Sequence, residues 1–224
     1  MTVEIVVFNG SGRLPADLEA EIRAGIGEGV SALGQHLELG RIGIAVHVNE
    51  LMGSEDGFGG LSLAPDSCRI SVDPYSDMLP RVARPRAAAV AIHELHHVLR
   101  MRQPFWPRAA DICAGEAIVL EGLATHCEMF LGQAEPWLVR EARNPLTHQY
   151  LREITPDVAD PRSNWGWIYR RRELPTGTAI YPMGHAVVGA YLSAAGTTPI
   201  DAIGVPWQDV WATWSDLSSR SLRG

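Results

Sequence analysis

The chain has no surplus of positive charge and no long apolar run. Its 224 residues include 19 Lys and Arg against 26 Asp and Glu, which gives a formal net charge of -7. Nucleic acid and anionic membrane surfaces are therefore disfavoured as partners. No segment approaches the roughly 20 consecutive apolar residues that a membrane-spanning helix requires. We therefore expect no membrane insertion.

Cysteine is also scarce. The three cysteines, Cys68, Cys113 and Cys127, are an odd number and have no CxxC spacing. This usage fits a reducing compartment better than a disulfide framework. Residues 1–8 lack the basic start and the long apolar core of a signal peptide. These features predict a cytoplasmic protein.

Apolar periodicity predicts a strand-rich first part and a helical second part. The chain length suits one domain, which we expect to span residues 1–224 with an N-terminal α/β lobe over about 1–82 and an active-site and helical lobe over about 83–224. In the first lobe we expect a strand at 3–8, a helix at 15–37, a strand at 42–48, a flexible glycine-bearing connection at 51–60 and a hairpin formed by 61–64 and 68–73. In the second lobe we expect a helix at 84–101, with Pro85 as its first residue, and further helices at about 111–131, 135–141, 146–153 and 182–194. We expect an ordered loop at 155–174. The last element should be an amphipathic helix around Trp207, Val210, Trp211 and Trp214.

The helix predicted at 84–101 contains the pattern HExxH. His93 and His97 lie one turn apart on the same face, so their imidazole nitrogens can converge on one metal ion. Glu94 follows His93, rotated by roughly 100°, where its carboxylate can take a proton from a metal-activated water. His96 is also a near neighbour of His93, and we expect it to lie beside the site or to hydrogen-bond a ligand. The plain alternative is a helix with incidental histidines.

A catalytic zinc site needs three protein ligands and one open position. On the next predicted helix Glu121 is the best candidate for the third ligand, and Glu128 on the same face is its rival. Glu116 faces nearly the opposite way, so we expect it to be solvated. His126 and Cys127 lie off that face, and we interpret them as a surface histidine and a buried thiol.

The run HELHH, followed by EGLA at 121–124, resembles the gluzincin clan of metallopeptidases, and in particular the DUF2268 family of predicted Zn-dependent proteases. The resemblance implies zinc bound by His93, His97 and Glu121, with Glu94 as the general base. Members often have an acidic residue after EGLA, where this chain has Thr125. Glu128 or Asp111 could replace that acidic group in orienting a ligand histidine.

The same resemblance implies an oxyanion-stabilising Tyr or His on a later helix. The segment 181–185, YPMGH, supplies His185 and, as a weaker candidate, Tyr181. An ordinary helix start is an equally good interpretation of either residue. Residues 57–60, GFGG, precede the predicted hairpin, and they either let an extended peptide approach the backbone or form a flexible tip.

These observations predict an α+β, zincin-like fold: a small twisted N-terminal sheet with one helix, the HExxH helix, and a mainly helical C-terminal lobe. The predicted function is a zinc metallopeptidase that acts on a peptide or protein. One alternative is a non-catalytic metal-binding protein with a regulatory or interaction role, in which Glu94 would be unnecessary. Another is hydrolysis of a non-peptide amide or ester by the same residues.

Overall fold

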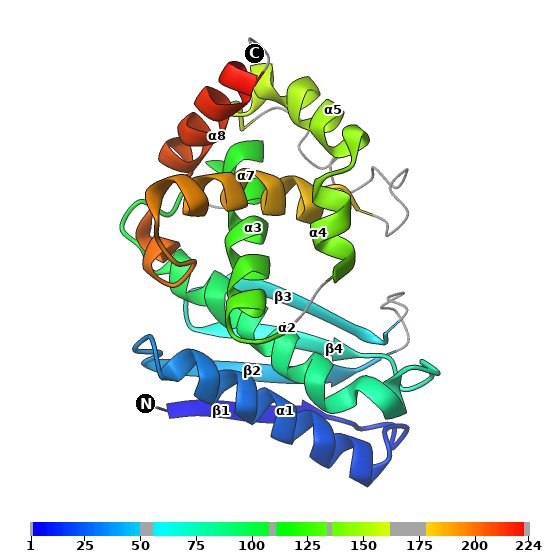
Figure 1. The fold of residues 1–224 in the computed structure, drawn as a ribbon. Coiled ribbons are helices and arrows are strands. Elements are labelled where there is room, and N and C mark those ends of the chain that lie inside the picture. Colours follow the sequence, from blue (N-terminus) through cyan, green and yellow to red (C-terminus); the bar gives the residue numbers. More distant parts are fainter. Residues whose placement is uncertain (1, 50–55, 108–110, 134–135, 162–177, 222–224) are drawn as a thin grey trace. The chain divides into compact units, whose positions relative to one another are not determined.

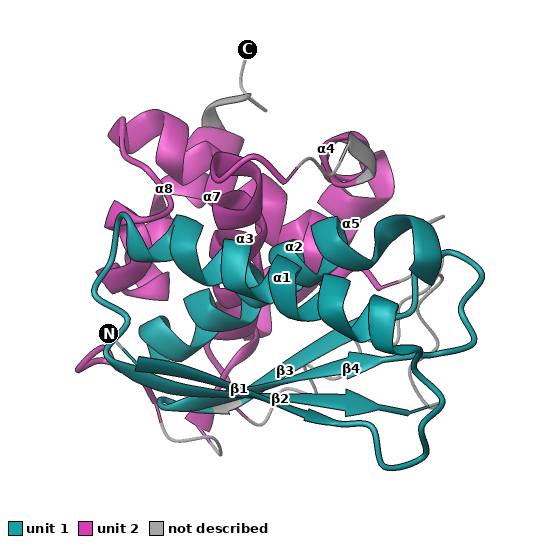
Figure 2. Ribbon diagram, turned by 90° about the horizontal axis from the view of Figure 1, so that it is seen from below, with its two compact units in different colours: residues 1–102 teal, residues 103–224 magenta. Residues whose placement is uncertain are grey.

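A computed structural model describes residues 2–49, 56–107, 111–133, 136–161 and 178–221. The chain forms two compact units, residues 1–102 and residues 103–224, coloured separately in Figure 2. The fold is α+β, with the strands in the first unit and helices throughout, as the sequence predicts. The first unit keeps the HExxH helix together with the sheet. That the two units form one zincin-like domain stays a prediction.

The first unit is built on a four-stranded mixed sheet (Figure 1). The strands β1 (Thr2–Phe8), β2 (Arg41–Val48), β3 (Phe58–Ala64) and β4 (Ser67–Val72) lie in the order β1-β2-β4-β3. β1, β2 and β4 are parallel, and β3 runs antiparallel to β4 at the sheet edge. The strand alternation fixes the register, since Ile44 pairs with Cys68 and Val46 with Ile70, and all four are buried.

Two helices, α1 (Ala16–Gly34) and α2 (Leu79–Met101), cover one face of this sheet (Figure 2). They pack closely because α1 presents glycines to the backbone of α2. A Cβ atom built on Gly25 would lie 2.1 Å from the Arg84 carbonyl oxygen, and one built on Gly29 would lie 2.6 Å from that of Ala88. This close approach holds α2, and with it the HExxH segment, against α1.

The prediction that Pro85 begins its helix is wrong. α2 begins at Leu79, has Pro80 in its first turn and contains Pro85 in its interior. Pro85 removes one intrahelical hydrogen bond, but packing against α1 continues through this part of α2. The expected connection at 51–60 is also too long, since residues 58–60 belong to β3. Residues 50–55 lie outside the described part of the chain.

The second unit is helical. α3 (Ala114–Phe130) packs along α7 (Ile180–Ala195), and α5 (Pro145–Ile154), α8 (Trp207–Ser221) and the short η3 (Asp201–Gly204) add residues to their shared apolar core. α4 (Pro136–Ala142) contacts α7 and α5, and η2 (Thr155–Asp157) follows α5. These helices confirm the predicted ones within a few residues. The expected loop at 155–174 begins with η2, and its residues from 162 onward lie outside the described ranges.

Glycines also set the α3–α7 contact. A Cβ atom on Gly122 would lie 2.3 Å from the Gly184 carbonyl oxygen. The glycine after Glu121 is therefore required for helix packing. Within the described ranges, none of the helices combines the length and apolar character that crossing a membrane requires.

Candidate metal centre

The HExxH residues converge as their spacing predicts. The rings of His93 and His97 lie edge to face, with centroids 4.5 Å apart and an interplanar angle of 82°. Potential ligand atoms of His93, Glu94 and His97 all lie within 4.8 Å of one another. His93 and His97 supply imidazole nitrogen donors of the kind that zinc takes in proteins, and the Glu94 carboxylate lies beside them. The residues present therefore fit a zinc ion.

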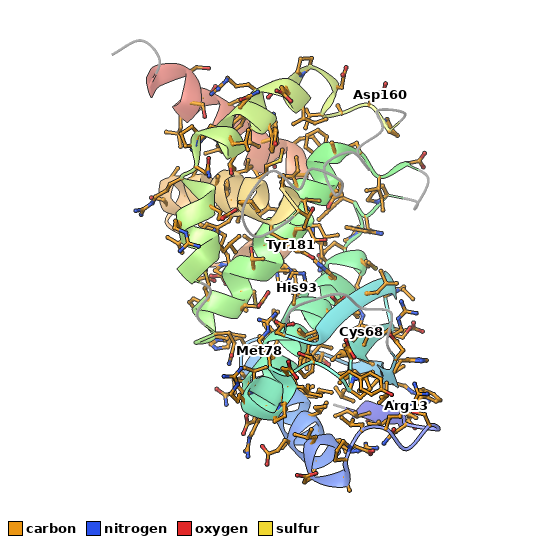
Figure 3. All side chains as sticks on the ribbon, turned by 90° about the vertical axis from the view of Figure 1, so that its right-hand side faces the viewer. Arg13, Cys68, Met78, His93, Asp160 and Tyr181 are labelled. Carbon is orange, nitrogen blue, oxygen red and sulfur yellow. The ribbon has the colours of Figure 1, made fainter. Side chains whose placement is uncertain are left out.

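The groups of this cluster are largely withdrawn from solvent. Glu94 is 4% exposed and His97 5% exposed, whereas His93 is half-buried. His96 is fully buried, and it is outside the cluster of converging ligand atoms found in the described residues. Figure 3 labels His93 on α2 and Cys68 on the neighbouring sheet. The histidines whose ligand atoms converge are thus His93 and His97, at i and i+4.

Strand β3 supplies two neighbours of Glu94 that the sequence analysis missed. The Ser62 hydroxyl donates to Glu94 Oε2, with 2.6 Å between the oxygens, and it lies 3.0 Å from the Glu94 carbonyl oxygen. A Cβ atom on Gly60 would lie 2.1 Å from Glu94 Oε1. The available signal was the strand alternation, which puts Gly60 and Ser62 on the same face.

The charge of the Glu94 carboxylate also affects the pKa of the Cys68 thiol. Cys68 pairs with Ser62 across the β3–β4 ladder. Burial raises the pKa of Cys68 to about 12, and the nearby charge of Glu94 adds to this rise. Cys68 therefore stays a neutral thiol near the Glu94 carboxylate.

In the second unit, α3 carries the candidate glutamates. Glu121 is 7% exposed and Glu128 is 5% exposed. Thr125 between them is buried and donates to the Gly122 carbonyl oxygen at 3.0 Å, so its hydroxyl serves the helix itself. The role of Glu121, or of its rival Glu128, as the third metal ligand stays a prediction. So does the role of Glu128 or Asp111 in orienting a ligand histidine.

The expectation that Glu116 is solvated is wrong, because its side chain is 1% exposed. It lies in the first turn of α3, where a carboxylate is favoured by the helix dipole. The ring of Trp207 from α8 covers the adjoining Gly115 so closely that a Cβ atom there would lie 2.3 Å from it. Tertiary packing thus buries a side chain that the helix pattern alone left outside.

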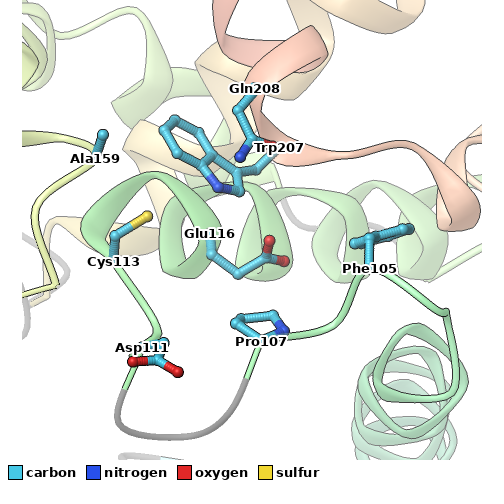
Figure 4. Close-up of a pocket in the computed structure, with 8 residues that line it drawn as sticks. All are labelled: Phe105, Pro107, Asp111, Cys113, Glu116, Ala159, Trp207 and Gln208. Atoms are coloured by element: carbon cyan, nitrogen blue, oxygen red, sulfur yellow. The ribbon is translucent and has the colours of Figure 1, made fainter.

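Glu116 lines a pocket of about 350 Å³ in the second unit (Figure 4). The pocket contains none of the predicted metal ligands, general base or oxyanion-stabilising residues, but Asp111, a candidate for orienting a ligand histidine, lies in its wall. Its walls are formed by Phe105, Pro107, Asp111, Cys113, Glu116, Ala159, Trp207 and Gln208.

His185 lies on α7 and stacks on His126 of α3. Their ring centroids are 4.1 Å apart and the ring planes differ by 4°, and His126 Nε2 lies 3.0 Å from the His185 carbonyl oxygen. Burial lowers the pKa of His185 to about 4, with further lowering from the charges of His126 and Arg143. His126 is therefore a packed residue of the α3–α7 contact.

Tyr181, at the start of the same helix, is partly buried against the core of the second unit. Its role and that of His185 in stabilising an oxyanion stay predictions.

The model of one protein family, DUF2268, described as predicted Zn-dependent protease, matches residues 44–212. The chain belongs to this family. The match runs from β2 to α8 and so includes the HExxH segment, EGLA and the start of α7. A search of curated proteins and a search of solved structures find no match. Membership in DUF2268 therefore rests on the family model alone.

Proposed function

We propose that this DUF2268 protein is a zinc-dependent metallopeptidase that hydrolyses peptide bonds with a metal-activated water. The observation that carries the proposal is the convergence of ligand atoms from His93, Glu94 and His97 within 4.8 Å. The description of the family as a predicted Zn-dependent protease supports it.

His93 and His97 bind the zinc in this proposal, and Glu121 is the third ligand. Support for Glu121 comes from the EGLA segment, which resembles the ligand segment of gluzincins, and from the burial of the side chain. Glu128 remains the competing ligand, since it is buried on the same helix.

Glu94 is the general base. When bound, zinc polarises the scissile carbonyl as a Lewis acid and lowers the pKa of a water molecule toward neutrality. Glu94 accepts the proton of the attacking water and then passes it to the leaving amine. Burial of Glu94 keeps competing bulk water away from its carboxylate.

His185, or less favourably Tyr181, donates a hydrogen bond to the developing oxyanion in this proposal. The lowered pKa of His185 keeps its imidazole neutral at pH 7, with one N–H to donate. Tyr181 offers a phenolic O–H from the preceding turn of α7.

The substrate is an extended peptide or protein segment. β3 lies at the edge of the described sheet and has β4 as its neighbour there, and an edge strand can bind a peptide by adding a strand. We propose that the reaction takes place in the cytoplasm, without nucleic acid or membrane partners, in keeping with the net charge of -7.

Metal analysis tests the ligand set. Wild-type protein purified without added zinc should hold about one equivalent of zinc, as a three-ligand site would. His93→Ala, His97→Ala and Glu121→Ala should each lose most of it, whereas His148→Ala, which changes an exposed histidine, should keep it. Less than about half an equivalent in the wild type would overturn the zinc site.

Activity on a diverse peptide library tests the chemistry. Glu94→Gln should lower kcat by about 10²–10⁴-fold while zinc content is unchanged, since the amide cannot take the proton. If zinc-loaded wild type and Glu94→Gln are equally inactive on peptides, the non-catalytic metal-binding function replaces the peptidase.

A further inference from the structure

Both carboxylate oxygens of Glu94 lie against strand β3. Oε2 accepts a hydrogen bond from Ser62 Oγ at 2.6 Å. Oε1 lies over the Cα atom of Gly60, where a Cβ atom would come within 2.1 Å of it and within 2.5 Å of Glu94 Cδ. Each oxygen therefore has a separate neighbour, and both neighbours come from one strand.

Ser62 is suited to this contact by its burial. Its side chain is 7% exposed and Glu94 is 4% exposed, so water competes weakly for the hydrogen bond. The hydroxyl has a single proton. Its shorter contact is with the side-chain oxygen, 2.6 Å against 3.0 Å to the Glu94 carbonyl oxygen, so the carboxylate is its preferred acceptor. A charge-assisted bond of this kind is about twice as strong as a neutral one.

We propose that Ser62 is a positioning residue for Glu94, and that glycine at position 60 leaves the space that the carboxylate occupies, so that a side chain there would displace it. The catalytic part of this inference rests on the proposed peptidase function. A free glutamate side chain has several rotamers, and ordering it costs conformational entropy. Ser62 selects the orientation that directs Oε1 along the surface of Gly60.

The consequence for catalysis is geometric. Misplacement of a reacting group by about 1 Å can lower a rate by about 10²-fold. Without the Ser62 hydroxyl the Glu94 carboxylate can turn away, and with a methyl group at position 60 it must move. In both cases the carboxylate is still present and the metal-binding histidines are unchanged.

Kinetics of matched variants test the positioning role. Ser62→Ala should lower kcat about 10–100-fold with little change in KM, and Ser62→Thr, which restores a hydroxyl, should recover most of the loss. Gly60→Ala should cause a loss at least as large. The matched controls are Ser67→Ala, at an exposed serine of the same hairpin, and Gly43→Ala, whose Cβ atom would meet nothing within 4 Å. Both controls should keep wild-type kcat, and all variants should keep their zinc.

A serine that only fastens β3 to α2 would give a different result. In the Glu94→Gln background, a positioning role predicts that Ser62→Ala has little further effect on the residual rate. Equal fold-losses in the wild-type and Glu94→Gln backgrounds would overturn the proposal. So would failure of Ser62→Thr to recover kcat in a variant that unfolds at the wild-type temperature.

Unfolding of metal-free protein separates this inference from the proposed function. Ser62→Ala and Glu94→Ala each remove one partner, so the double variant should lower the unfolding midpoint by less than the two single shifts added together. Additive shifts would overturn the contact. If shifts are non-additive while zinc-loaded wild type hydrolyses no peptide, the hold of Ser62 on Glu94 is supported and the peptidase function fails.

Discussion

At the scale of single residues, the three cysteines are predicted to be unreactive in the folded protein. All are free and buried. Burial raises the pKa of Cys68 and of Cys127 to about 12, with added contributions from Glu94 and Glu128 respectively, and burial also raises that of Cys113. Since the thiolate is the reactive form, native protein at pH 8 should react slowly with a disulfide reagent, whereas unfolded protein should show three reactive thiols.

A Ser67→Cys variant supplies the control for this measurement. Position 67 is exposed and adjoins Cys68 on β4. The variant should gain one rapidly reacting thiol with no change in the slow ones. Rapid reaction of a wild-type cysteine in the native state would contradict its burial.

Single residues also show which parts of the candidate site the sequence could predict and which it could not. The spacing of His93 and His97 is local, and helix geometry alone brings them together. The contact of Ser62 with Glu94 joins residues 32 positions apart, and the Trp207 ring beside Gly115 comes from a distant helix. Such contacts depend on tertiary packing, which no spacing within one element encodes.

At the scale of elements, strands and helices were predictable wherever apolar residues recur with a clear period. α1 illustrates this, since Ile22, Ile26 and Leu33 are buried as their spacing predicts. The start of α2 was not predictable, because Pro85 is a local signal for the first turn of a helix. In the structure it lies inside α2, where its cost is offset by packing on Gly25 and Gly29 of α1. The local preference of proline for the first turn of a helix is here outweighed by the close contact between α1 and α2.

The α3–α7 contact should weaken in acid. The pKa of His185 is lowered to about 4, and burial also lowers that of His126. Because the unfolded state then binds more protons than the folded state below pH 6.5, the stabilisation is fully present above about pH 6.5 and is lost as the pH falls toward 4. Arg143 acts in the same direction on His185. Urea unfolding of metal-free protein between pH 7 and 4.5 should show this loss.

Two variants separate the contribution of His185 to the acid-dependent loss of stability from that of the carboxylates elsewhere in the chain, which are also protonated in acid. His185→Phe keeps an aromatic ring against His126 but cannot be protonated, so its stability should fall less steeply with acid. His148→Gln changes an exposed histidine in the same unit and should keep the wild-type slope. Equal slopes in wild type and His185→Phe would contradict the assignment.

At the scale of the whole molecule, the proposed ligands come from both compact units. His93 and His97 belong to residues 1–102, and Glu121 belongs to residues 103–224. The seven tryptophans all lie in the second unit. Tryptophan fluorescence therefore reports the unfolding of the unit that contains Glu121 and not of the unit that contains the two histidines.

This distribution makes zinc-induced stabilisation a test of the third ligand. Zinc at about 100 times its Kd should stabilise the wild type by about 2.7 kcal/mol. If Glu121 is the third ligand, as proposed, the tryptophan-reported midpoint should rise as well. In Glu121→Ala the two histidines can still hold zinc weakly, but the tryptophan-reported midpoint should no longer respond. Glu128→Ala should keep the wild-type response. If Glu128→Ala abolishes the response and Glu121→Ala does not, Glu128 is the ligand. If neither variant abolishes the response, the third ligand is another residue of the second unit, or that unit supplies no ligand.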